Sequence, residues 1–202
     1  MEKEVTHNLT ETRISSEPVF DGKLLHARRD LVELPNGEQA IREYIVHPGA
    51  VLVIPVLPDG RLVFERQYRY PLKRAFIELP AGKIDPDEDP LVTGQRELLE
   101  ETGYSAKQWE FVATLHPCIG YSDEAIHIYL AKELSLGEHK RDDEEFLEIF
   151  AMSLPEAMEA MHRGEITDGK TMIALFWMHT WLQQSHDELS VGQPTEMIVR
   201  NA

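Results

Sequence analysis

The middle of the chain carries an apolar run that predicts a buried strand. From Ala50 to Leu57 the sequence AVLVIPVL is almost continuously apolar, as expected for a strand covered on both faces. The turn residues Pro58-Asp59-Gly60 follow, and a second strand is expected from Arg61 to Tyr68. Shorter strands are predicted at residues 76–79, 109–115, 126–131 and 146–150.

A β-hairpin is expected before this run. Val19 to Leu34 and Ile41 to His47 read as strands on either side of Pro35-Asn36-Gly37, a combination typical of a hairpin turn. The first dozen or so residues of the chain are polar and lack periodicity, so we expect them to be frayed.

Three helices are expected between and after the strands. The first lies between Asp89, a typical N-cap that is followed by proline, and Gly103, a typical C-terminal cap. The second runs from Leu154 to about Arg163, and the third from Asp168 to about Gln184. The stripe of the third helix that we expect to enter the core consists of Met172, Leu175, Phe176 and His179.

Because strands and helices are interleaved, the predicted fold class is α/β or α+β. We expect one catalytic domain over residues 49–185. An N-terminal extension over residues 1–48 would carry the hairpin and mediate dimerisation, and residues 186–202 would form a polar C-terminal tail.

The composition is globular and strongly acidic. Of 202 residues, 42% are apolar, and 36 acidic against 20 basic side chains give a formal net charge of −16. Such a charge repels phosphate backbones and anionic lipid headgroups, so neither nucleic acid nor a membrane is an expected partner. An anionic substrate would need divalent cations or a local basic patch to supply positive charge.

Other signals point to a cytoplasmic protein. No apolar run approaches the roughly 20 residues of a membrane span, and the charged start Met1-Glu2-Lys3-Glu4 is not followed by an apolar segment. The single cysteine, Cys118, excludes an intramolecular disulfide and is interpreted as a loop residue. The histidines show no metal-ligand spacing with carboxylates or with Cys118, so zinc is not expected.

The segment GKIDPDEDPLVTGQRELLEETGY, from Gly82 to Tyr104, carries the most informative chemistry. On the predicted helix Glu97, Glu100 and Glu101 are related by i, i+3 and i+4, so their carboxylates project from one face. Like charges at this spacing repel one another, but a hard divalent cation such as Mg²⁺ among them would make the arrangement favourable.

Neighbouring residues fit the same interpretation. Arg96 can pair with Glu100 and hold the array, while Gly82 allows a close backbone approach that leaves the carbonyl of Ala81 free as a further oxygen ligand. A solvated acidic face would be the ordinary explanation of a Glu-Glu pair alone. Seven residues at fixed spacing, at roughly 7% usage each, coincide by chance at about 10⁻⁸ per starting position.

These seven residues are Gly82, Glu88, Arg96, Glu97, Leu98, Glu100 and Glu101. The segment resembles the Nudix box, the signature of the Nudix hydrolases. The resemblance implies the Nudix fold, a mixed β-sheet sandwiched between helices, and Mg²⁺-dependent hydrolysis of a nucleoside diphosphate linked to another group, with Mn²⁺ as the alternative cation. It also implies that Glu97 and Glu101 bind the metal, that Glu100 supports them and that Arg96 orients them.

Further motifs resemble the ADP-ribose pyrophosphatase branch of the family. They are Arg66-Gln67-Tyr68-Arg69-Tyr70, Glu78-Leu79-Pro80-Ala81-Gly82, the loop from His116 to Glu124, and Gly164-Glu165-Ile166-Thr167-Asp168. In the loop, Cys118-Ile119-Gly120 replaces the usual Pro-Gly.

The branch motifs supply candidate substrate-binding residues. Arg69 suits a bidentate contact to a pyrophosphate oxygen, with a surface ion pair as the alternative. Glu124 could accept hydrogen bonds from a ribose hydroxyl or be an exposed loop carboxylate. Glu78 and Gly82 complete the expected substrate-binding set with them.

A second acidic run, Asp142-Asp143-Glu144-Glu145, would alone be a solvated loop. In ADP-ribose pyrophosphatases a flexible loop at this place delivers the glutamate that activates water. The strand pattern of Phe146-Leu147-Glu148-Ile149 indicates Glu145 as this base, with Glu144 as the alternative.

The leading hypothesis is therefore hydrolysis of ADP-ribose to AMP and ribose 5-phosphate. The alternatives are a broader nucleotide-sugar diphosphatase, acting on ADP-glucose or GDP-mannose, and a module that senses ADP-ribose without cleaving it. A homodimer formed through the Val19 to His47 hairpin is also expected, because a lone two-stranded extension is marginally stable. The resemblance makes Arg42 a candidate contact to the substrate across that interface.

Overall fold

The computed structural model describes residues 8–137 and 146–190. The strands are β1 (Thr12–Asp21), β2 (His26–Glu33), β3 (Gln39–Val46), β4 (Ala50–Pro55), β5 (Leu62–Arg69), β6 (Arg74–Glu78), β7 (Ala81–Lys83), β8 (Tyr104–Leu115), β9 (Ile126–Leu136) and β10 (Leu147–Met152). The helices are α1 (Pro90–Thr102), α2 (Leu154–His162) and α3 (Gly169–Ser190), with a 3₁₀ turn at Tyr70–Leu72.

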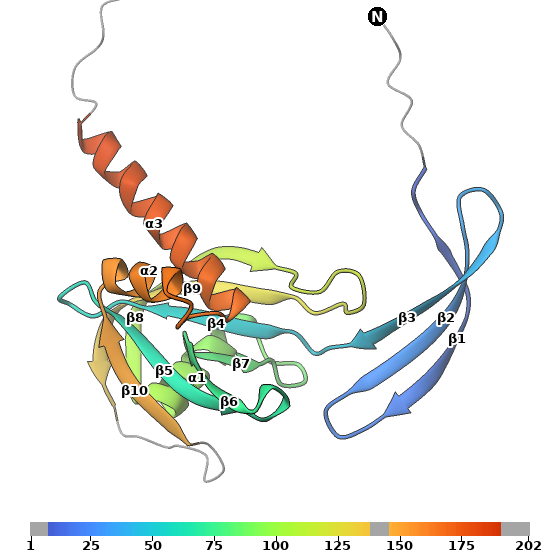
Figure 1. The fold of residues 1–202 in the computed structure, drawn as a ribbon, viewed down its shortest axis with the longest axis horizontal. Coiled ribbons are helices and arrows are strands. Elements are labelled where there is room, and N and C mark those ends of the chain that lie inside the picture. Colours follow the sequence, from blue (N-terminus) through green and yellow to red (C-terminus); the bar gives the residue numbers. More distant parts are fainter. Residues whose placement is uncertain (1–7, 138–145, 191–202) are drawn as a thin grey trace, which may run out of the picture.

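The N-terminal extension is a three-stranded antiparallel sheet, β1-β2-β3, which stands apart from the remaining elements (Figure 1). The predicted turn at Pro35-Asn36-Gly37 is confirmed, since the Gly37 amide donates to the Leu34 carbonyl at 2.9 Å. The single strand predicted from Val19 to Leu34 was wrong. The chain reverses between Gly22 and Leu25, whose backbone groups hydrogen-bond at 2.9 Å, and β1 and β2 pair across this reversal.

The remaining strands form two sheets that meet around β4 and β5. One sheet has the order β7-β4-β9-β8, with β4 and β9 parallel and the other pairs antiparallel. The other sheet, β10-β5-β6, is antiparallel throughout. The mixed α+β class predicted from the sequence is confirmed. Strand β7 was not predicted, because three residues after Pro80 are too short to show a period.

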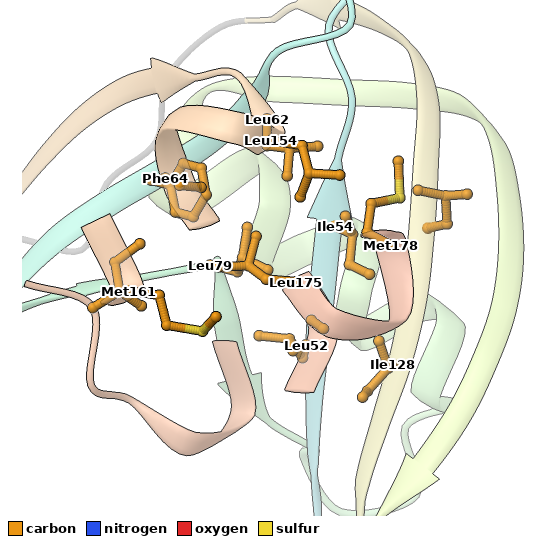
Figure 2. Close-up of a cluster of buried hydrophobic side chains, with 14 of the residues drawn as sticks. Leu52, Ile54, Leu62, Phe64, Leu79, Ile128, Leu154, Met161, Leu175 and Met178 are labelled. Carbon is orange, nitrogen blue, oxygen red and sulfur yellow. The ribbon is translucent and has the colours of Figure 1, made fainter. Parts of the chain in front are cut away.

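Strand β4 separates two hydrophobic clusters. Leu52 and Ile54 face the larger cluster, which α2 and α3 cover (Figure 2). Val51 and Val53 point the opposite way and pack with Leu98 of α1. The alternation of side chains along a strand explains why an uninterrupted apolar run was needed here.

The helix ends follow the predicted capping chemistry. The Asp89 side chain accepts a hydrogen bond from the Leu91 amide at 2.8 Å, and Gly103 ends α1 with a φ of 74°. Helix α2 begins at a capping box in which Ser153 and Glu156 bond to each other's backbone amides. No helix in the described parts of the chain has the length and apolar character needed to span a membrane.

The buried face of α3 differs from the predicted stripe. Ala174, Leu175 and Met178 enter the core, whereas Phe176 is 48% exposed and His179 is exposed as well. The prediction was wrong for these two residues. An α-helix turns about 100° per residue, and Phe176 and His179 each come one position after a residue that enters the core, Leu175 and Met178 respectively.

Candidate active site

A cavity of about 770 Å³ lies where the two sheets and two helices meet. Its walls come from β7, α1, the β5–β6 region, the start of α3 and the loop before β4. Charged residues on these walls are Arg69, Glu78, Lys83, Glu97, Glu101, Glu124, Asp168 and Lys170. Carboxylates outnumber cationic side chains, so an anionic substrate would be repelled unless positive charge is added.

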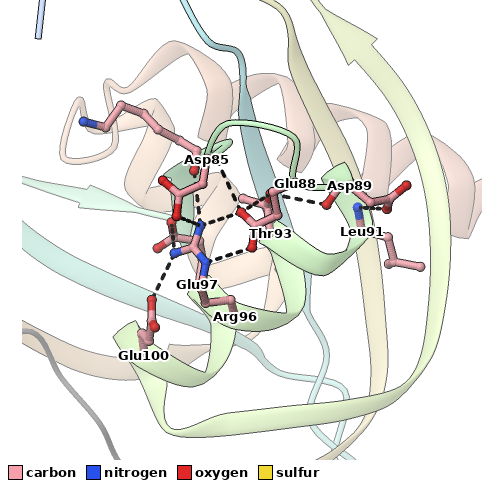
Figure 3. Close-up of polar contacts among 9 residues, drawn as sticks. Asp85, Glu88, Asp89, Leu91, Thr93, Arg96, Glu97 and Glu100 are labelled. Carbon is pink, nitrogen blue, oxygen red and sulfur yellow. Dashed lines mark hydrogen bonds and ion pairs between the residues drawn. The ribbon is translucent and has the colours of Figure 1, made fainter.

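Arg96 organises the exposed side of α1 (Figure 3). Its Nη1 donates to Glu97 at 2.8 Å and to Glu100 at 3.1 Å, and its Nε and Nη2 donate to Glu88 at 3.1 and 2.9 Å. The predicted pairing of Arg96 with Glu100 is therefore present. Hydrogen bonds from Arg96 and Thr93 lower the pKa of Glu88 to about 2, so this carboxylate stays charged.

Two α1 glutamates pack directly on β7. An added Cβ at Gly82 would lie 1.9 Å from the carboxyl carbon of Glu97, so only glycine leaves room for this side chain. The buried Glu101 accepts a hydrogen bond from the Ala81 amide at 3.0 Å. Gly82 thus sets the distance between the strand and the helix, as the sequence predicted in outline.

These oxygen donors fit a hard divalent cation. As the side chains stand, no three acidic, histidine or cysteine residues in the described segments converge on one point that could hold a metal ion. Glu97 and Glu100 instead contact Arg96, while Glu101 contacts β7. Metal binding would require some of these contacts to be exchanged, while the excess of carboxylates around the cavity favours a cation there.

Another part of the cavity lining carries a chain of ion pairs. Arg69 binds Glu78 through two parallel hydrogen bonds of 2.7 Å each, from Nε and Nη2. Lys170 donates to the same Glu78 carboxylate and, at 3.0 Å, to Asp168. Burial acts to raise the pKa of Glu78, but its bonds and charge attraction to Arg69 and Lys170 outweigh burial and hold the pKa below its usual range.

Behind this wall lies a second acidic side chain, Glu65, which is fully buried opposite Glu78 in the β5–β6 pairing. Burial, and next the negative charge of Glu78, raise the pKa of Glu65 to about 8, although Arg69 and Lys170 act in the other direction. Glu65 therefore keeps its proton at neutral pH, which limits the negative charge that must be buried here.

The lining of the cavity also includes Glu124 and His47. The His47 Nε2 lies 3.8 Å from Glu124 Oε1, and the His47 amide donates to Asp123 at 2.7 Å. Glu124 thus lines the cavity with a neighbouring donor instead of standing alone in an exposed loop.

The predicted site residues fall into three groups. The cavity brings together Arg69, Glu78, Ala81, Gly82, Glu97, Glu101 and Glu124. Arg96 and Glu100 lie beside it and contact Glu97 or each other. Arg42 lies on β3 and binds Glu11 at 2.9 and 2.5 Å, away from this cavity, and Glu144 and Glu145 lie outside the described residues.

The sequence analysis did not identify Lys170, Asp168 and Glu65 as site residues. Each of them nevertheless occupies an unusual position in the sequence that could have drawn attention to it. Lys170 occupies the first turn of a helix, where a cation is disfavoured by the helix dipole, and Asp168 precedes that helix in an N-cap position. Glu65 interrupts an otherwise apolar part of β5. None of these signals identifies a partner far away in the sequence.

Comparisons with known proteins identify the family. A profile of the NUDIX domain matches residues 46–175, and one of the nucleoside diphosphate sugar hydrolase N-terminal domain matches residues 11–45. An ADP-ribose pyrophosphatase of Bacillus subtilis (strain 168) is 40% identical over 173 residues, covering 85% of this chain and 94% of the relative. A methanol dehydrogenase activator of Bacillus methanolicus is 41% identical over 170 residues, covering 83% and 92%. The crystal structure of an ADP compounds hydrolase superimposes with a TM-score of 0.79 at 25% identity, covering 88% of this chain and 97% of that one. The resemblance read from the sequence is thereby confirmed, and the chain belongs to the Nudix family, whose hydrolases generally use divalent metal ions.

Proposed function

We propose that this protein hydrolyses the diphosphate bond of ADP-ribose, giving AMP and ribose 5-phosphate, with Mg²⁺ as the cofactor and Mn²⁺ as the alternative. The observation that carries the proposal is the cavity in which Glu97 and Glu101, packed on β7, lie on one wall and Arg69 on another. The ADP-ribose pyrophosphatase of Bacillus subtilis, similar over most of both chains, supports this choice of substrate.

The residues around β7 and α1 are proposed to bind the metal ion. Glu97, Glu101 and the carbonyl of Ala81 would hold the cation, with Glu100 in support, and Arg96 keeps the glutamates oriented through its hydrogen bonds. The cation would supply the positive charge that neutralises the diphosphate.

Arg69 would contact the diphosphate directly. Since its Nε and Nη2 contact Glu78, the edge that includes Nη1 remains for a phosphoryl oxygen. Glu124, which also lines the cavity, would accept hydrogen bonds from a ribose hydroxyl, with His47 beside it.

The general base is proposed to be Glu145, with Glu144 as the alternative. A carboxylate that accepts a proton from the attacking water typically contributes about 10²–10⁴-fold to the rate. Glu145→Gln should therefore lower kcat by about that factor while metal and substrate binding stay nearly intact. Asp143→Asn, in the same acidic run, is the matched control and should keep wild-type kcat. If Glu144→Gln loses activity and Glu145→Gln keeps it, the assignment moves by one residue.

A homodimer formed through the N-terminal sheet completes the proposal. The sheet leaves Ile14, Val19, Phe20 and Ile41 about half exposed, and such apolar side chains favour burial against a partner. Arg42 on β3 is the candidate contact to the partner's substrate. Light scattering should report a dimer, Phe20→Glu should shift it toward the monomer, and Leu136→Glu, at an exposed apolar site outside this sheet, should not.

The substrate assignment is tested with a panel of nucleoside diphosphate sugars. Purified protein with Mg²⁺ should release AMP from ADP-ribose faster than it cleaves ADP-glucose or GDP-mannose. Reversal of that order would favour the broader nucleotide-sugar diphosphatase. Tight binding of ADP-ribose without turnover under any divalent cation would favour the sensing module. Reaction in ¹⁸O-labelled water would identify which phosphorus is attacked.

A further inference from the structure

Lys170 occupies an unfavourable place for a cation. It is the second residue of α3, where the positive end of the helix dipole opposes its charge, and its side chain is only 15% exposed. A buried ammonium is costly unless it is paired and hydrogen-bonded. The structure meets this need with two carboxylates, those of Glu78 and Asp168.

Both carboxylates also form hydrogen bonds to other groups. Asp168 accepts the Thr171 amide at 3.0 Å and so caps α3, and Glu78 binds Arg69 through two bonds. Two cations thus share Glu78. An ammonium has three donors, and Lys170 uses two of them within the described residues, which leaves one for a ligand.

Arg69 and Lys170 both line the cavity, and so do Glu97 and Glu101. We propose that Lys170 is a second cationic substrate-binding residue, which together with Arg69 contacts the phosphoryl oxygens of a nucleoside diphosphate in the cavity that the α1 glutamates also line. This inference rests on the diphosphate hydrolysis proposed above. It adds a residue from the C-terminal helix α3, in which the sequence predicted no site residue.

The competing explanation is that Lys170 only holds Glu78 in place. The two explanations differ in what changes when the charge is removed. A contact to phosphate appears in KM and in the affinity for phosphate compounds, whereas a purely structural contact appears in the thermal midpoint.

The test compares Lys170→Met and Lys170→Gln with Lys170→Arg and with the control Lys107→Met. Lys107 is exposed on β8, outside the residues that line the cavity. For Lys170→Met and Lys170→Gln we expect KM for ADP-ribose to rise about 10- to 100-fold, as for loss of one charged hydrogen bond, with little change in Mg²⁺ activation. Lys170→Arg should recover most of the affinity, and Lys107→Met should match wild type.

A second measurement keeps the inference testable if ADP-ribose is not the substrate. Calorimetry with inorganic pyrophosphate and Mg²⁺ should show weaker binding to Lys170→Gln than to wild type, at high and low salt, whatever sugar the enzyme prefers. An unchanged KM and unchanged pyrophosphate affinity in folded Lys170→Gln would overturn the inference. Absent turnover of ADP-ribose by the wild type, with pyrophosphate binding still dependent on Lys170, would instead reject only the proposed substrate.

Discussion

Replacing Gly82 with alanine should separate metal binding from folding. The new Cβ would lie 1.9 Å from the carboxyl carbon and one oxygen of Glu97, and 2.5 Å from its Cγ. Ordinary contacts between carbon atoms begin near 3.5 Å, so the Glu97 carboxylate must move by about 1.5 Å or more. Because Cγ is also too close, the side chain has to change rotamer, and it would lose its 2.8 Å bond to Arg96.

The same replacement is not expected to destabilise the fold. Gly82 is not among the residues with positive φ, so alanine can adopt its backbone conformation. Such a replacement tends to stabilise the folded protein by about 0.4–1 kcal/mol, because it reduces the conformational entropy of the unfolded chain. We therefore expect an unfolding midpoint near that of wild type. Displacing a metal ligand or its supporting contact typically costs about 10- to 100-fold in metal affinity, which we expect in the Mg²⁺ activation constant, together with a lower kcat.

The assay is ADP-ribose hydrolysis over a Mg²⁺ titration, alongside thermal unfolding of the metal-free protein. Gly120→Ala is the matched control, because a Cβ there meets open space and the backbone is unstrained. Wild-type Mg²⁺ activation and kcat in Gly82→Ala would refute the reasoning, since Glu97 would then have no part in the metal site. Loss of folding would refute the claim that the side chain, and not the backbone, adjusts.

Three further predictions concern the walls and the core. Arg96→Met should raise the Mg²⁺ activation constant about 10- to 100-fold, since Glu97 and Glu100 lose their shared donor, and the same Mg²⁺ titration measures it. Glu65 has a pKa of about 8 in the folded protein against an ordinary value of 4.5, so between these pH values the folded state binds a proton that the unfolded state has lost. The free energy of unfolding should therefore fall as pH rises from about 4.5 to 8. Urea unfolding without metal should show this fall in wild type and not in Glu65→Gln. Leu62→Ala, at a fully buried position, should cost about 2–5 kcal/mol in urea unfolding, and a smaller loss would mean that the core collapses around the gap.

Local sequence rules predicted the parts of the site that lie within one element. The spacing of Arg96 and Glu100 on a capped helix was enough to foresee their contact, because helix geometry makes side chains four positions apart neighbours. The contact of Arg96 with Glu97 was implied only by the family resemblance. The capping residues Asp89 and Gly103 were predictable for the same reason.

Contacts between distant elements could not be foreseen in this way. Lys170 and Glu78 are 92 positions apart, and their pairing depends on how α3 docks against β6. Strand β1 was missed for another reason: it is exposed along its whole length, so it lacks the apolar alternation that identifies a half-buried strand. The pairing of β1 with β2 is instead fixed by the reversal at Gly22.

The position of β4 between the two hydrophobic clusters has a consequence for how the protein unfolds. Leu52 and Ile54 belong to one cluster and Val51 and Val53 to the other, while the backbone of the same strand pairs with Ala81 and Gly82 of the site. Neither cluster can separate from β4 without exposing apolar surface on that strand, so the two halves should unfold as one cooperative unit. The amides of β4 are then expected to exchange with deuterium more slowly than those of the N-terminal sheet, and a ligand that stabilises the site should slow exchange in α3 as well as in α1.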